Sequence, residues 1–146
     1  LPKKYFSKIN KYKQQVTSKI LKKRIKKNTK IFNMIKYLSK NYKIAIATNA
    51  VKSTLNICLN KLGIKKYIDF KLSNEDIKYS KPNPEIYLRI FIEFGIYPSE
   101  ALVVEDSHYG REAAISSGAK LLPIKKVEEL TLKKIESNLT SKKINL

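Results

Sequence analysis

From residue 43 onward, short β-branched and aliphatic runs alternate with segments whose apolar positions recur every three or four residues. This alternation is typical of a parallel sheet covered by helices, so the sequence predicts an α/β fold. Gly63 and Gly95 are expected to close the first two helices, and Asn83-Pro84 to begin the second with Asn83 as its N-cap. The predicted strands are residues 43–48, 67–72, 101–104 and 120–124.

The N-terminal part has a different pattern. Residues 3–41 are predicted to be entirely helical, and Ile31, Ile35 and Leu38 share one face of the helix that precedes the first strand. Residues 3–27 are expected to be a separate basic helical piece. After Lys126, apolar positions recur at helical spacing before the chain becomes polar. The sequence has no internal repeat and no glycine-rich nucleotide-binding loop.

Composition favours one globular domain in a reducing compartment. The chain has 146 residues, of which 42% are hydrophobic and 29% charged, enough for a single core. Its only cysteine, Cys58, has no partner for an intrachain disulfide, so we expect a cytoplasmic location. The longest aliphatic runs are far shorter than the roughly 20 residues that cross a bilayer, and no membrane anchor is expected.

Charge is distributed very unevenly. Residues 1–68 hold 19 of the 31 Lys and Arg residues and no acid, whereas residues 69–146 are neutral overall. The basic half could attract phosphates or nucleic acid. However, 28 of the 31 basic residues are lysine, as expected of an AT-rich genome, while nucleic-acid grooves usually use arginine and interleaved aromatics. Nucleic acid is therefore not the expected partner.

Chemistry is expected just after the strands, because ligands of open parallel sheets bind beyond the carboxyl ends of the strands. Thr48 and Asn49 follow the first strand with a hydroxyl, an amide and the N–H groups of a helix start, which suit a phosphate. Glu105 and Asp106 follow the third strand, and adjacent carboxylates suit a hard cation such as Mg²⁺. Between them in sequence, prolines frame Lys81 in a loop that leads to a helix.

Three segments together resemble the haloacid dehalogenase (HAD) superfamily of hydrolases. Ile44-Ala-Ile-Ala-Thr-Asn49 is similar to the second motif of that family, Lys81-Pro-Asn-Pro-Glu-Ile-Tyr87 to the third, and Val103-Val-Glu-Asp-Ser-His-Tyr-Gly110 to the fourth. Their order and spacing point to the branch of phosphoglycolate phosphatases and β-phosphoglucomutases. The resemblance implies a Rossmann-like parallel sheet flanked by helices, with a helical cap remnant at residues 1–27 and the core at residues 28–146.

The resemblance also implies a role for each residue of the site. Thr48, with the backbone at Asn49, would bind the transferring phosphoryl group, and Lys81 would neutralise its charge. Asp106 would ligate Mg²⁺, and Glu105 would assist directly or through a metal-bound water. Ser107 and Gly110 are expected to shape the turn into the next helix, and His108 to be a loop residue.

One part of the family pattern is missing. Members attack phosphorus with an aspartate and use a second aspartate two residues later as general acid and base. The chain has only Asp69, Asp76 and Asp106, and no two are separated by a single residue. The chain begins with Leu1, and it is therefore expected to be an inactive fragment that lacks the first motif and the central strand of the sheet.

The sequence thus predicts part of a magnesium-dependent phosphatase or phosphomutase for a small phosphorylated metabolite. It leaves open a truncated gene, a pseudoenzyme, or a split protein in which a separate N-terminal fragment supplies the nucleophile. The alternative is a non-catalytic remnant that binds phosphorylated or polyanionic partners through its basic N-terminal half.

Overall fold

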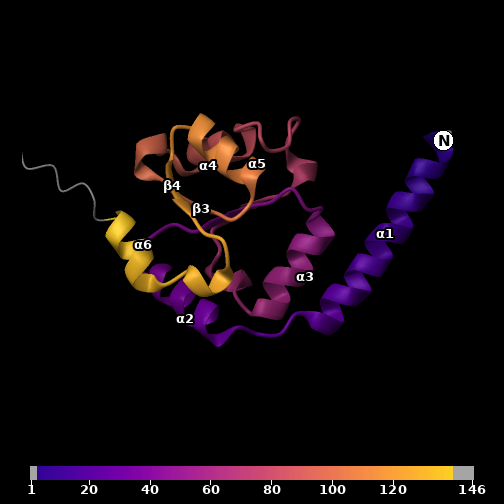
Figure 1. Cartoon of the computed structure of the whole chain (residues 1–146), viewed down its shortest axis with the longest axis horizontal. Coiled ribbons are helices and arrows are strands. Elements are labelled where there is room, and N and C mark those ends of the chain that lie inside the picture. Colours follow the sequence, from indigo (N-terminus) through magenta and orange to yellow (C-terminus); the bar gives the residue numbers. More distant parts are fainter. Residues whose placement is uncertain (1–2, 140–146) are drawn as a thin grey trace, which may run out of the picture.

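A computed structural model describes residues 3–139 of the chain, as a layer of four short strands between helices (Figure 1). None of the described helices is long and apolar enough to cross a membrane. The helices are α1 (Lys3–Arg24), α2 (Thr29–Leu38), α3 (Lys52–Leu62), α4 (Glu85–Phe94), α5 (His108–Ser116) and α6 (Leu132–Leu139). The strands are β1 (Ala45–Ala47), β2 (Phe70–Leu72), β3 (Leu102–Glu105) and β4 (Lys120–Pro123).

The N-terminal segment forms two helices, as expected from the separate piece at residues 3–27, but residues 25–28 and 39–41 are not helical, so the prediction of an entirely helical segment was wrong there. Helix α1 ends at Arg24, and α2 begins after Asn28. The side chain of Asn28 accepts a hydrogen bond from the backbone N–H of Ile31 at 3.1 Å, so it caps a new helix. A short polar side chain that bonds a backbone N–H thus marks where the second helix begins.

The other predicted elements are present, with β1, β2 and β4 shorter than expected and β3 shifted by one residue, so that Glu105 ends the strand instead of following it. Gly63 and Gly95 follow α3 and α4 with φ angles of 72° and 63°, a left-handed conformation that glycine adopts without strain. The predicted start of α4 is shifted by one residue, since Pro84 rather than Asn83 is the N-cap. Asn83 still serves the helix, because its side chain accepts from the N–H of Glu85 at 2.9 Å.

The strands form two separate parallel pairs, β1 with β2 and β3 with β4. In a parallel pair, alternate residues direct their backbone groups to opposite sides. The Thr48 N–H donates to Leu72 O at 3.0 Å, so the backbone groups of Thr48 point toward β2. The backbone N–H and C=O groups of Ala45 and Ala47, which alternate with it, therefore point away from β2. In β3, the residues that point away from β4 are Leu102 and Val104, because Glu105 O accepts from the chain after β4. Within residues 3–139 these two edges belong to no ladder.

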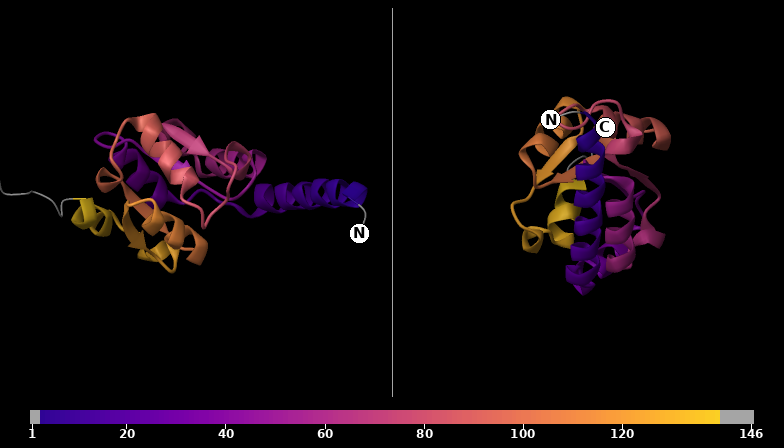
Figure 2. Two further views of the ribbon diagram at one scale, coloured as in Figure 1. Left: turned by 90° about the horizontal axis from the view of Figure 1, so that it is seen from above. Right: turned by 90° about the vertical axis from the view of Figure 1, so that its right-hand side faces the viewer.

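Shared helix layers hold the two pairs together, as the views in Figure 2 show. On one face, side chains of all four strands pack with α4 and α5 around Ile86, which is fully buried. On the other face, Met34 and Leu38 of α2 pack with Leu122 and Ile135, and a third cluster joins α2 to α3. The prediction of a helix-flanked parallel α/β fold is therefore confirmed.

Candidate active site

A cavity of about 280 Å³ lies where the chain leaves β1 and β3. The residues that follow β1 and β3 both line this cavity, so the two strands end at the same edge of the strand layer. The five predicted site residues all line this cavity: Thr48, Asn49, Lys81, Glu105 and Asp106. The remaining lining residues are Ala47, Ala50 and Ser107.

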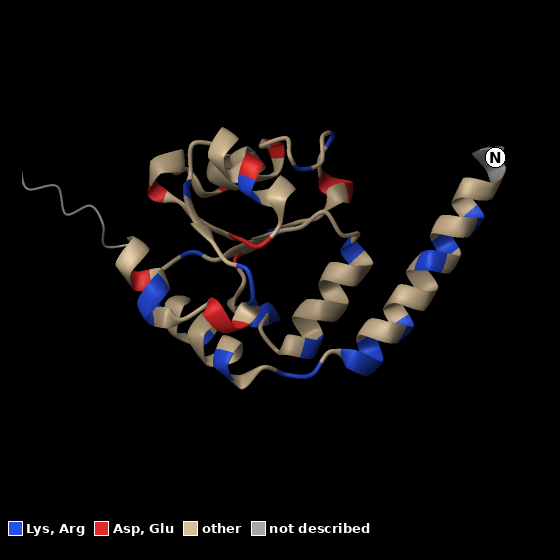
Figure 3. Ribbon diagram, viewed as in Figure 1, with Lys and Arg blue, Asp and Glu red and all other residues tan. Residues whose placement is uncertain are grey.

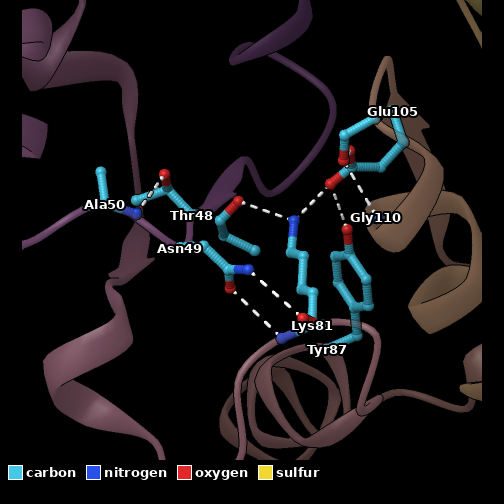
Figure 4. Close-up of polar contacts among 9 residues, drawn as sticks. Thr48, Asn49, Ala50, Lys81, Tyr87, Glu105 and Gly110 are labelled. Carbon is cyan, nitrogen blue, oxygen red and sulfur yellow. Dashed lines mark hydrogen bonds and ion pairs between the residues drawn. The ribbon is translucent and has the colours of Figure 1, made fainter.

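The loop after β1 is held in place by its own side chains. Thr48 Oγ1 accepts a hydrogen bond from the N–H of Ala50 at 3.1 Å. This bond does not use the hydroxyl proton, which can be donated to another acceptor. The side-chain amide of Asn49 clamps the backbone of Lys81: its Oδ1 accepts from Lys81 N at 3.2 Å, and its Nδ2 donates to Lys81 O at 3.4 Å. Asn49 therefore fixes the distance between the β1 loop and the lysine loop (Figure 4).

Lys81 joins the two strand pairs. Its Nζ donates to Ala47 O at 3.1 Å, a group on the unpaired edge of β1, and forms an ion pair with Glu105 at the end of β3. The side chains of Lys81 and Glu105 are only 6% and 10% exposed. The Lys81–Pro82 peptide bond is cis. Because an ammonium has three donors and two are engaged, one remains for a ligand in the cavity.

Glu105 is the centre of a buried polar cluster. Besides Lys81, it accepts from the hydroxyl of Tyr87 and, at 3.2 Å, from that of Ser107. Burial raises its pKa, but the donors, Lys81 first and then Tyr87, outweigh burial and hold the pKa below its ordinary value. Burial and the neighbouring carboxylate raise the pKa of Tyr87. Glu105 is thus held as an anion and Tyr87 as a neutral donor.

Gly110 makes room for this carboxylate. A Cβ at Gly110 would lie 2.0 Å from Glu105 Oε2 and 2.6 Å from Ser107 Oγ, too close for any side chain. Ser107 is the N-cap of α5, and its Oγ accepts from the Gly110 N–H at 3.0 Å. Both residues shape the start of the helix as predicted, and Gly110 also permits the burial of Glu105.

Asp106 differs from its neighbour because it is exposed at the cavity. Within the described chain its carboxylate makes no ion pair, while its backbone oxygen accepts from Arg111 Nη1 at 2.6 Å. Residues 3–139 hold no group of three or more Asp, Glu, His or Cys side chains placed to bind a metal. The described residues therefore fit Mg²⁺ only in part, since Asp106 supplies one open carboxylate and a protein magnesium site commonly uses one or two with substrate oxygens.

The other aspartates and the histidine have local roles. Asp69 pairs with Lys43 at 3.0 Å and accepts from the Ile44 N–H, at the opposite end of β1 from the cavity. Asp76 completes a capping box with Ser73. His108 pairs with Glu112 on the exposed side of α5 and does not line the cavity.

Two features of the site were not predicted from the sequence, the Asn49 clamp and the bond from Tyr87 to Glu105. A signal existed for Tyr87, because it lies on the apolar face of α4 with Ile86 and Ile90, and a buried tyrosine hydroxyl needs a partner. For Asn49 there was none, since its partner is a backbone 32 residues away.

Comparisons with known proteins give a consistent result. The family model of haloacid dehalogenase-like hydrolases matches residues 2–124. A phosphorylated carbohydrates phosphatase of Thermotoga maritima is 32% identical over 111 residues, which cover 75% of this chain and 50% of that protein. The chain spans half or less of the length of the curated relatives that it matches.

Solved structures share the fold. A proposed β-phosphoglucomutase of Thermotoga maritima is 26% identical with a TM-score of 0.67, and the match covers 92% of this chain and 61% of that one. A family IA hydrolase of Entamoeba histolytica has a TM-score of 0.78 at 21% identity, with 95% of this chain and 73% of that one covered, and shows likeness of fold alone.

Proposed function

This chain belongs to the haloacid dehalogenase-like hydrolase family, and from that premise we propose that it forms the phosphate-binding half of the active site of a magnesium-dependent phosphatase or phosphomutase. The observation that carries the proposal is the convergence of Thr48, Lys81 and Asp106 on one cavity from three separate segments. The substrate class is a small phosphorylated metabolite, in keeping with the carbohydrate phosphatase among the relatives.

The residues of the chain would hold a phosphoryl group in a defined way. The Thr48 hydroxyl and the backbone N–H of Asn49 donate to phosphate oxygens, and the remaining proton of Lys81 donates to a third. Glu105 does not touch the substrate in this scheme. Held as an anion by Tyr87 and Ser107, it keeps the Lys81 ammonium fixed and charged at the cavity. Such a preorganised cation stabilises charge that develops during phosphoryl transfer.

A bound Mg²⁺ would neutralise further charge on the phosphate, with Asp106 as one of its ligands. Since Asp106 is the only aspartate of the chain at the cavity, the attacking carboxylate and further ligands must come from elsewhere. We place their source in a separate segment whose strand lies between β1 and β3. The unpaired edges of Ala45 and Ala47 on one side and of Leu102 and Val104 on the other suit a parallel strand.

Inorganic phosphate is a suitable probe of the half-site. Titration of the ¹⁵N-labelled chain should shift the amide signals of Thr48, Asn49 and Ala50, and Thr48→Val should weaken binding about tenfold through loss of one donor. The matched control, Thr29→Val, makes the same change at an exposed position outside the cavity. Shifts that are confined to the basic helix α1 would instead favour the polyanion-binding alternative and reject this site.

The missing nucleophile is tested by activity. The chain with Mg²⁺ should not hydrolyse p-nitrophenyl phosphate, because it has no carboxylate positioned for attack. A synthetic peptide with a run of β-branched residues followed by Asp-x-Asp should raise the thermal midpoint of the chain and restore turnover, while a scrambled peptide should do neither. Turnover by the chain alone that disappears in Asp106→Ala would reject the separate-nucleophile proposal.

A further inference from the structure

The chain that follows β1 is held from two directions. We call residues 48–50 the phosphate loop, because all three line the cavity. On one side, the side chain of Asn49 binds the backbone of Lys81. On the other side lies the short helical turn η2 (Asn74–Asp76), which follows β2. The N–H of its first residue donates to Ala50 O at 3.1 Å, so this turn contacts the last residue of the loop.

Glu75 of η2 also caps helix α3 from a distant segment. The N-cap of α3 is Val51, which has no polar side-chain atom, and the first turn contains no acidic residue. A helix start leaves backbone N–H groups without partners inside the helix. Glu75 Oε2 accepts from one of them, the Lys52 N–H, at 2.6 Å, and places a negative charge at the positive end of the helix dipole. The start of α3, directly after the phosphate loop, is thus fixed by η2.

Asp76 keeps this turn in place. Its carboxylate accepts from the backbone N–H and the hydroxyl of Ser73, at 2.9 and 2.7 Å, and Ser73 is fully buried. The same carboxylate pairs with the Lys52 ammonium at 2.6 Å, so η2 binds Lys52 through both its backbone and its side chain. Residues 1–68 contain no acid, and the start of α3 takes this charge from the second half of the chain, as the red turn close to it shows in Figure 3.

These two carboxylates lie outside the cavity, because neither Glu75 nor Asp76 is among the described residues that line it. They can therefore act on a ligand there only as charges or through the loop that they hold. As charges they disfavour an anion, since like charges repel. As acceptors they favour it, because they fix the backbone that presents the donors, and misplacement of binding groups by about 1 Å can cost up to ~100-fold. The two roles have opposite signs and can be separated by experiment.

We propose that Glu75 is a positioning residue of the phosphate site, and that Asp76 holds the turn that carries it. Together they keep the phosphate loop in the conformation that presents the Thr48 hydroxyl and the Asn49 N–H to a phosphoryl group. Neither carboxylate touches the ligand. The inference rests on the proposed function, since it requires phosphate to bind at this loop.

Two substitutions at Glu75 of the full chain separate reach from charge. Glu75→Asp keeps the charge but shortens the side chain by one methylene group, so the carboxylate no longer reaches the Lys52 N–H. Glu75→Gln removes the charge and keeps an oxygen acceptor. We expect Glu75→Asp to bind inorganic phosphate about fivefold more weakly, as for loss of one hydrogen bond, and Glu75→Gln to bind within about twofold of the wild type. The dissociation constants come from ¹⁵N amide shifts of the phosphate loop in the folded chain, so a change of stability alone does not alter them.

Glu100→Asp is the matched control. Glu100 Oε2 accepts from the Tyr97 N–H at 2.8 Å just before β3, at the edge of the strand layer opposite to the cavity. The same shortening at this position should leave phosphate affinity unchanged. Without phosphate, Glu75→Asp should move the amide signals of Ala50 and Lys52, whereas Glu100→Asp should not.

Asp76→Asn provides an independent check, since it removes the charge that pairs with Lys52. It should weaken phosphate binding, whereas a charge effect alone would tighten it. Unchanged affinity in Glu75→Asp, or tighter binding in Glu75→Gln or Asp76→Asn, would overturn the inference and leave the proposed function intact. Absence of phosphate-induced shifts in the loop of the wild type would overturn both.

Discussion

Loss of the Lys81 ammonium should destabilise the chain strongly, because it leaves a buried carboxylate without its counter-charge. The side chains of Lys81 and Glu105 are 6% and 10% exposed. Lys81→Met keeps most of the apolar stem and removes only the charge. Removal of one partner of a buried ion pair costs about 3–5 kcal/mol, and replacement of both charges is often neutral.

The lower end of that range is expected here. Tyr87 and Ser107 still donate to Glu105 in the variant, so the carboxylate is not left entirely without partners. We therefore expect Lys81→Met to lower the free energy of unfolding by about 3 kcal/mol. Lys81→Met/Glu105→Gln removes both charges and keeps an acceptor for Tyr87. It should recover about 2 kcal/mol of that loss.

Urea unfolding followed by circular dichroism at pH 7 measures these differences for the wild type, Lys81→Met and the double variant. Lys43→Met is the matched control, because Lys43 pairs with Asp69 while 72% of its side chain is exposed, and such surface pairs contribute about 1 kcal/mol or less. If Lys81→Met fails to fold, the double variant should still fold. The stabilising role of the buried ion pair would be refuted if Lys81→Met lowered the free energy of unfolding no more than Lys43→Met does. It would also be refuted if the double variant were no more stable than Lys81→Met.

Three further outcomes follow from the same cluster and its surroundings. Gly110→Ala should cost about 1–3 kcal/mol in urea unfolding because the new Cβ collides with Glu105, and an unchanged stability would contradict the collision. Tyr87→Phe should raise the pKa of Glu105 in a ¹³C NMR titration, since one donor to the carboxylate is lost, and an unchanged pKa would contradict that bond. Asp76 has a pKa lowered to about 2, because its lysine and serine partners outweigh burial. Its stabilising contribution is therefore complete above about pH 4 and is lost as the pH falls toward 2, and Asp76→Asn should show a shallower acid loss in urea midpoints.

The location of the site could be predicted from the sequence because it follows from topology alone. Each predicted strand in the alternating pattern places its carboxyl end on the same edge of the layer, so Thr48 and Asp106 were expected to meet there. The structure brings them together with Lys81 around one cavity. Local signals also gave the ends of α3 and α4 correctly, because a glycine after an amphipathic segment closes a helix through its own backbone.

Contacts between distant segments could not be predicted in this way. The clamp of Asn49 on the Lys81 backbone depends on how two loops approach in space, and no periodicity encodes that approach. Here a single asparagine side chain satisfies backbone groups that a pattern of apolar positions does not describe.

The adjacent carboxylates Glu105 and Asp106 show how a strand separates two neighbouring residues that a sequence motif treats as a pair. Successive side chains of a strand point to opposite faces, so two adjacent residues cannot both face the same ligand in the same way. Val103 and Glu105 lie on the face that α4 covers, where Tyr87 meets the carboxylate. Asp106 follows the strand and is exposed at the cavity. Position in the strand therefore gives Glu105 the task of holding Lys81 and leaves Asp106 as the carboxylate that is open to a cation.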